Sequence, residues 1–142
     1  MKPLACCVAV SEKYGLDLCM IWPKSVDGHR FRTFLRRLRA KYPFRRMCVY
    51  LDNLGFHKSN ATKKVYQEQR LEHIFNPPYS PFANPIEECF SVVKHDFKKA
   101  KLRRITQATK ETDEDLIESA LQKINGELVK NCVRHSNKLV NE

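Results

Sequence analysis

The segment that most constrains the fold is a five-residue apolar strand that follows an amphipathic helix. Residues 47–51 are almost continuously apolar, as in a strand buried in a mostly parallel α/β sheet. Ahead of it, apolar residues recur at helical spacing over 31–38, in a helix that begins after Asp27 and that Pro43 ends. This order predicts an α/β fold with Asp52 at the carboxyl end of the strand, where open α/β sheets bind ligands.

Apolar periodicity elsewhere along the chain predicts further strands and helices. Two short apolar runs joined by a Gly-containing loop indicate a β-hairpin at the start. Ser59 is a good N-cap for a second helix, and Thr112 opens a capping box ahead of one final amphipathic helix. The chain therefore reads as a single domain over 1–142, with a mixed sheet flanked by helices. These further elements are strands at about 4–10, 16–22 and 73–75 and helices at about 59–71, 85–101 and 112–129.

The helix predicted from Pro85 has Asn84 as its candidate N-cap, follows a rigid proline-rich loop and carries two adjacent acids. At about 100° per residue, Glu87 falls beside the apolar stripe, whereas Glu88 points roughly away from the core. Glu87 can therefore meet groups at the edge of the sheet, and Glu88 is expected to be a solvated charge near the positive end of the helix dipole. The predicted core-facing stripe consists of Ile86, Phe90, Val93 and Phe97.

Asp52 and Glu87 together suggest a metal site. An Asp and a Glu side by side repel each other unless a cation lies between them, and oxygen ligands suit Mg²⁺ or Mn²⁺. Residue types alone leave a second interpretation open. Asp52 can simply cap a turn with Asn53, and Glu87 can be an ordinary acid of a helix N-terminus.

A strong positive charge favours nucleic acid as the partner. The formal net charge is +10, from 26 Lys and Arg against 16 Asp and Glu, although a basic surface that is merely solvated is about equally compatible with it. Lys94 and Lys98, on the stripe below Glu87, either contact a DNA backbone or are ordinary solvated lysines. The basic face of the first helix, with Arg36, Arg37 and Arg39, is expected to be solvated.

Cellular context follows from what the sequence lacks. No run of about 18 apolar residues is present, and the first ten residues do not resemble a signal peptide, so we expect an intracellular protein with no membrane partner. The six cysteines contain no Cys-x-x-Cys pair, which favours reduced, buried thiols over disulfides or zinc.

Four short motifs carry a family resemblance. Asp52-Asn53 ends the predicted strand, His57-Lys58-Ser59 follows it, residues 77–81 read Pro-Pro-Tyr-Ser-Pro, and residues 84–87 read Asn-Pro-Ile-Glu. With Phe90 and Lys94 behind them, these motifs resemble the signature of the Tc/mariner transposase superfamily. Between Asp52 and Glu87 lie 34 residues, a spacing typical of the Asp-Asp-Glu branch of that superfamily.

The resemblance implies a ribonuclease-H-like fold and metal-dependent cleavage and transfer of DNA strands. In this interpretation Asp52 and Glu87 are the second and third carboxylates of an Asp-Asp-Glu triad that holds two Mg²⁺ or Mn²⁺ ions for phosphoryl transfer. Asn53 and His57 lie near the site, although a His57 satisfied by the backbone is about equally expected. Lys58, Lys94 and Lys98 are the candidate DNA-binding residues.

One departure from the family pattern limits the functional interpretation. The first aspartate of the family lies on a strand ahead of the hairpin, and neither Asp17 nor Asp27 occupies its position. The DNA-reading amino-terminal domains are also outside the sequence. We therefore expect either a fragment of an active transposase or a co-opted remnant that binds DNA without sequence preference. A homodimer is possible, in the nucleus of a eukaryote or otherwise in the cytoplasm.

Overall fold

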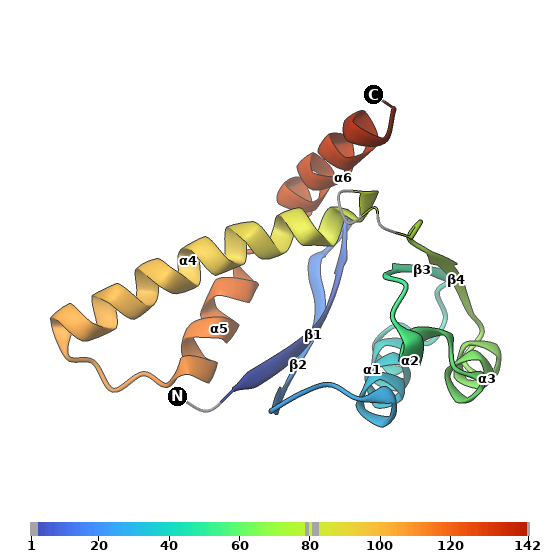
Figure 1. Cartoon of the computed structure of the whole chain (residues 1–142), viewed down its shortest axis with the longest axis horizontal. Coiled ribbons are helices and arrows are strands. Elements are labelled where there is room, and N and C mark those ends of the chain that lie inside the picture. The colour runs from blue at the N-terminus through green and yellow to red at the C-terminus, as the bar shows by residue number, and fades with distance from the viewer. Residues whose placement is uncertain (1–2, 79, 81–82, 142) are drawn as a thin grey trace. The chain divides into compact units, whose positions relative to one another are not determined.

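The strands and helices form an α/β structure divided into two compact units. The computed structural model describes residues 3–78, 80 and 83–141. The first unit comprises Met1–Cys7 and Met20–Asn84, and the second comprises Val8–Cys19 and Pro85–Glu142. The described strands form two separate two-stranded sheets, one of β1 (Leu4–Ser11) with β2 (Gly15–Pro23) and one of β3 (Met47–Leu51) with β4 (Leu71–Phe75) (Figure 1). The predicted α/β class is thus confirmed, whereas the described strands do not join into one mixed sheet.

A parallel crossover forms the centre of the first unit. Strand β3 (Met47–Leu51) pairs in parallel with β4 (Leu71–Phe75), in a register that sets Met47 opposite Leu71 and Leu51 opposite Phe75. The connection contains the short helix α2 (Gly55–Lys58) and helix α3 (Asn60–Glu68). Because the two strands run parallel, their carboxyl ends lie at the same edge of the sheet. The segment α2-α3 is the crossover connection that such a pair requires.

Helix α1 (Gly28–Lys41) completes the first unit, and its ends are where the sequence predicts them. The side chain of Asp27 caps the helix by accepting from the backbone N–H of Arg30 at 2.8 Å. Its apolar stripe packs against β3, α3 and β4, which fills the core of this unit. That core consists of the buried residues Phe31, Leu35, Leu51, Val65, Tyr66 and Leu71.

Two expectations for the first unit need correction. Helix α3 is capped by Ser59 as predicted, but it ends at Glu68 because Arg70 adopts a positive φ of 53° before the strand begins. Arg39 is not merely a solvated charge. Its guanidinium donates hydrogen bonds of 2.7 Å each to the carbonyl oxygens of Gln69 and Arg70, so it ties the end of α1 to the turn before β4.

Three helices and the tip of the hairpin form the second unit. The hairpin consists of β1 (Leu4–Ser11) and β2 (Gly15–Pro23), and the helices are α4 (Pro85–Gln107), α5 (Asp113–Gln122) and α6 (Gly126–Asn141). Among the residues that the structure describes, no helix is both long and apolar enough to span a membrane. The buried core of this unit consists of Cys89, Val93, Ala120, Leu121, Ile124, Val129 and Cys132.

The face of α4 that packs in the core differs from the predicted one. Cys89 and Val93 are its buried residues, whereas Ile86, Phe90 and Phe97 are only partly buried. The cause is α6, whose Cys132 lies against Cys89 with the two Sγ atoms 3.2 Å apart. A small side chain at each position lets the two helices approach closely.

The predicted final helix is broken into α5 and α6. The capping box of Thr112 and Asp115 is present as predicted, but the helix stops at Lys123. There the hairpin tip packs against the connection, with the backbone N–H of Leu16 donating to the carbonyl of Ile124 at 3.3 Å. Gly15 has a φ of 76°, and a Cβ atom at this position would lie 2.5 Å from the Ile124 oxygen. A close backbone contact between distant segments therefore breaks the helix.

Candidate active site

Asp52 lies at the carboxyl end of β3, as predicted, with both its side chain and its backbone held. The side-chain amide of Asn84 donates a hydrogen bond of 2.7 Å to Asp52 Oδ1. The backbone oxygen of Asp52 lies 2.8 Å from Nδ1 of His57. The carboxylate is partly buried, so its orientation is defined while part of it stays open to solvent.

A network of asparagine side chains supports this end of the parallel strands. The amide of Asn53 donates to the backbone oxygen of Asn76 at 2.6 Å, and the amide of Asn76 donates to the oxygen of Ser80 at 2.7 Å. The hydroxyl of Tyr50 donates to Asn76 Oδ1 at 2.6 Å. Burial, followed by the charge of Asp52, raises the pKa of Tyr50, so the phenol stays a donor. These bonds hold the end of β3 and the start of the proline-rich loop in one arrangement.

His57 is a buried residue whose hydrogen bond is to the backbone of the candidate aspartate. Its ring packs against Phe31 and Phe56, with centroid distances of 4.2 Å and 4.8 Å, and only 9% of the residue is exposed. Burial lowers the pKa of His57, against smaller opposing effects of the hydrogen bond to Asp52 and of its charge. A neutral ring with its proton on Nδ1 donates to the Asp52 carbonyl. His57 is thus satisfied by the backbone beside the site.

Glu87 and Glu88 lie in the first turn of α4, in the second unit. Both are partly buried. Glu88 is not simply a solvated charge, because its carboxylate pairs with Nδ1 of His135 on α6. Asp52 belongs to the first unit, so the convergence of Glu87 with Asp52 stays a prediction, as does the greater exposure of Glu88.

The oxygen atoms around Asp52 fit a hard cation such as Mg²⁺ or Mn²⁺. Besides the carboxylate, Asn53 Oδ1 is a buried acceptor with no hydrogen-bond partner among the described residues, and a buried acceptor of this kind costs stability unless something satisfies it. Carboxylate and amide oxygens are the ligands that such ions prefer. No cluster of three or more His, Cys, Asp or Glu side chains suited to a metal occurs within the described ranges. The oxygen atoms of Asp52 and Asn53 are thus of the type that such an ion prefers.

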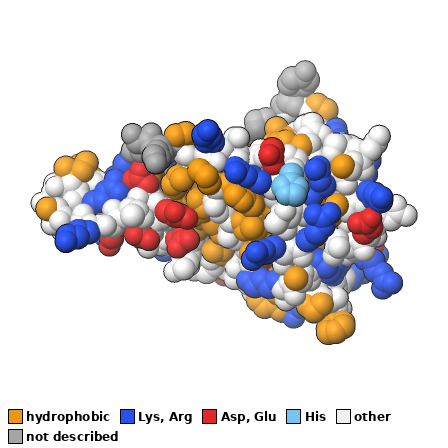
Figure 2. Space-filling view, turned by 90° about the horizontal axis from the view of Figure 1, so that it is seen from below, with side chains coloured by type: hydrophobic (Ala, Val, Ile, Leu, Met, Phe, Trp, Pro, Cys, Tyr) orange, Lys and Arg blue, Asp and Glu red, His pale blue; other side chains and the backbone are white. Residues whose placement is uncertain are grey.

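The candidate DNA-binding lysines are exposed. Lys58 lies over the ring of Phe75, with Nζ 5.1 Å from the centroid, and Lys94 and Lys98 project from α4 into solvent. Lys and Arg side chains cover much of the face shown in Figure 2. The described surface therefore offers cations that can contact phosphates without first breaking buried contacts.

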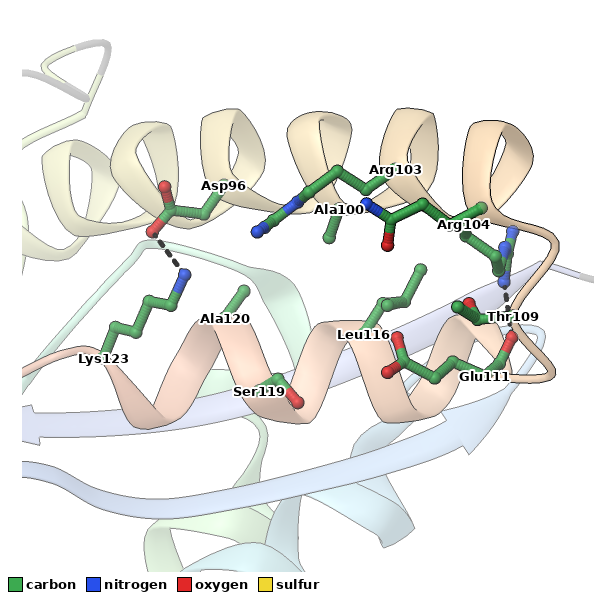
Figure 3. Close-up of a pocket in the computed structure, with 11 residues that line it drawn as sticks. Asp96, Ala100, Arg103, Arg104, Thr109, Glu111, Leu116, Ser119, Ala120 and Lys123 are labelled. Atoms are coloured by element: carbon green, nitrogen blue, oxygen red, sulfur yellow. Dashed lines mark hydrogen bonds and ion pairs between the residues drawn. The ribbon is translucent and has the colours of Figure 1, made fainter.

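A cavity of about 240 Å³ lies between α4 and α5 in the second unit, and Asp52 is not among its lining residues. Figure 3 shows two interactions among its lining residues, one between Lys123 and Asp96 and one between Arg104 and Glu111. Arg104 donates to the Glu111 carbonyl at 3.0 Å and pairs with Asp113 at 2.7 Å, and Lys123 lies 3.8 Å from Asp96. These pairs join the two helices, so we interpret the cavity as part of the helix packing.

Sequence reasoning missed the roles of Asn76 and Asn84. Asn84 was expected only to cap the following helix, and Asn76 received no role. A usable signal was present, because both residues stand at the ends of predicted strands and loops near Asp52. Their buried state, with 5% and 4% exposure, depends on contacts that no local pattern encodes.

Comparison with known proteins shows the family of this chain and solved structures with a similar fold. The model of the DDE superfamily endonuclease family matches residues 2–109. The catalytic domain of Mos1 transposase, solved with Raltegravir and Mg, superposes with a TM-score of 0.60 at 18% identity, over 92% of this chain and 74% of that one. No curated protein sequence is significantly similar.

Larger assemblies contain the same fold. The Mos1 strand transfer complex gives a TM-score of 0.58 at 19% identity, over 92% of this chain but only 42% of the Mos1 chain. A simian T-cell lymphotropic virus intasome gives 0.57 at 14% identity, over 83% of this chain and 46% of that one. The chain therefore spans less than half of these proteins. From its matched sequence over most of its length, the chain belongs to the DDE superfamily endonuclease family.

Proposed function

We propose that this chain is part of the catalytic domain of a DNA transposase that cuts and joins DNA strands. The observation that carries the proposal is Asp52, whose carboxylate stands at the end of a parallel strand and accepts a hydrogen bond from Asn84. In a chain of this family, a carboxylate held in that position is suited to binding a divalent ion. Glu87, in the Asn-Pro-Ile-Glu motif, is the proposed second ligand.

Mg²⁺ or Mn²⁺ is the proposed cofactor, and transposon-end DNA is the proposed substrate. Related structures support both choices. The Mos1 catalytic domain was solved with Mg, and a Mos1 paired-end complex was solved with Mn. Another Mos1 complex contains the left transposon end. The oxygen-rich surroundings of Asp52 agree with the metal, and the net charge of +10 agrees with the nucleic acid.

Each of the named residues has a separate role in the proposed reaction. When bound, a divalent ion stabilises the charge that develops on the transferred phosphoryl group. Asp52 and Glu87 supply oxygen ligands, and Lys58, Lys94 and Lys98 contact the DNA backbone. Asn53 and His57 keep the loop after β3 in place through their backbone partners. The homodimer and the nuclear location remain predictions.

A third carboxylate is needed for full activity, and we propose that it comes from a strand ahead of the hairpin. Phosphoryl transfer depends on positioning and charge stabilisation, so a site with one carboxylate fewer holds its ions poorly. Asp52 and Glu87 on their own are therefore expected to support neither nicking nor joining of DNA.

The test is a cleavage assay with Mg²⁺ and labelled DNA that carries family-like transposon ends. The chain is compared with a form extended upstream by the natural coding sequence. Cleavage by the extended form that disappears in both Asp52→Asn and Glu87→Gln supports the proposal. DNA binding without cleavage by the extended form, or cleavage that survives Asp52→Asn, contradicts it.

A further inference from the structure

Among the described residues, Asn84 is the side chain seen to donate a hydrogen bond to the carboxylate of Asp52. The geometry points to Asn84 as a positioning residue for Asp52. It donates to Oδ1 at 2.7 Å, so the other carboxylate oxygen, Oδ2, would be the one left to bind a divalent ion. This inference rests on the proposed function, because it assigns a task within the same site.

The chemistry of the donor suits this task. An amide N–H is neutral, so it restrains the carboxylate without neutralising its charge. A lysine or arginine here would place a positive charge close to the ion and would repel it. A serine or threonine hydroxyl has a shorter reach. Asparagine therefore combines sufficient length with a donor that does not compete with the metal.

Its surroundings fix Asn84 in place. The residue is 4% exposed. Immediately before it, the backbone N–H of Ala83 donates to Ser80 at 3.0 Å, and the Ala83 carbonyl lies 3.4 Å from the Tyr50 hydroxyl. Immediately after it, Pro85 disfavours helical backbone at Asn84. The amide is thus delivered by a restrained backbone, as a residue that orients a metal ligand requires.

The position in the chain adds a second consequence. Asn84 stands directly before α4, and Glu87 follows three residues later. A hydrogen bond from Asn84 to Asp52 therefore ties the segment that carries one proposed ligand to the side chain of the other. Loss of this bond should therefore lower metal affinity through both proposed ligands, and not only through the orientation of Asp52.

The test compares Mn²⁺ binding in variants of the full chain. Paramagnetic broadening of backbone amide resonances near Asp52 is followed in ¹⁵N spectra during a Mn²⁺ titration. Variants with Asn84→Ala and Asn84→Ser remove the donor or shorten it. Arg39→Gln is the matched control, because it deletes side-chain hydrogen bonds to the turn before β4, at the end of the strand pair away from Asp52.

We expect Asn84→Ala to weaken Mn²⁺ binding about 10- to 100-fold, as loss of an orienting partner typically does, with a smaller effect of Asn84→Ser. Arg39→Gln should lower the melting temperature and leave Mn²⁺ affinity within about twofold of the parent. Unchanged affinity in both folded Asn84 variants, while Asp52→Asn abolishes broadening, overturns the role of Asn84 alone. Broadening that is equal in the parent and in Asp52→Asn overturns the proposed function instead. If Asn84→Ala does not fold, Asn84→Ser decides the question.

Discussion

Replacement of His57 by phenylalanine tests how the loop after β3 is held. The new ring can keep the packing between Phe31 and Phe56, but the 2.8 Å hydrogen bond to the Asp52 carbonyl is lost. An acceptor left without its partner costs about 1–3 kcal/mol. For a chain of this size, about 3 °C of melting temperature corresponds to each kcal/mol, so the melting temperature should fall by about 3–9 °C at pH 7.5.

Acidification should narrow this difference. The folded-state pKa of His57 lies below its ordinary value because the ring is buried. The unfolded chain therefore takes up a proton near pH 6.5 while the folded chain does not. The stability contributed by the neutral ring is fully present above that pH, and it is lost as the pH falls from there toward the folded-state pKa. His57→Phe removes this loss, since phenylalanine does not titrate.

The assay is urea unfolding of both proteins between pH 7.5 and 5.0, with His73→Phe as the control. His73 is exposed and stacks on Tyr66 in the same unit, so its replacement should change stability by less than about 0.5 kcal/mol. A stability difference between His57→Phe and the parent that stays constant or widens on acidification would mean that His57 is charged in the folded protein. That result would refute the neutral, buried histidine.

Three further predictions address the second unit, the thiols and the charge. Gly15→Ala should lower the free energy of unfolding by at least about 2 kcal/mol, because Gly15 has a positive φ and no room for a Cβ atom. Gly55→Ala is the control, because the space around Gly55 is open. Equal unfolding curves for the two variants would contradict the packing of the hairpin tip. Burial raises the pKa of Cys89 to about 12 and also raises the pKa of Cys132. At pH 8, Ellman's reagent should therefore modify the exposed thiol of Cys48 first and the two buried thiols only on unfolding. Early modification of the Cys89 thiol in the folded protein would contradict this prediction. Finally, the chain should bind duplex DNA without sequence preference, with an affinity that falls steeply as the salt concentration rises. Fluorescence anisotropy measures this affinity. Binding that does not change with salt would count against contacts to the phosphates.

Local signals in the sequence were sufficient for much of the first unit. Strand 47–51 and the N-caps Asp27 and Ser59 are present as predicted, because an apolar run and a capping side chain act through near neighbours. The position of Asp52 followed from the end of the strand. The family resemblance, confirmed by the match over 2–109, added the chemical interpretation.

Features that depend on distant contacts were not predictable from local patterns. The break between α5 and α6 arises where the hairpin tip meets Ile124, and the rotated face of α4 follows from the contact between Cys89 and Cys132. Asn84 looked like a helix cap, yet its amide bonds to a residue 32 positions earlier in the chain. Sequence periodicity describes one element at a time, whereas these features require two.

The central claim is that Asp52 and Glu87 share one divalent ion, and a crystal soaked in Mn²⁺ tests it most directly. The anomalous difference map should show a peak within about 2.0–2.6 Å of a carboxylate oxygen of each residue, with Oδ2 as the ligand from Asp52. The two carboxyl groups should then lie on the order of 4–8 Å apart. A structure that sets these carboxylates on opposite faces of the protein, or a peak bound by neither residue, would contradict the claim.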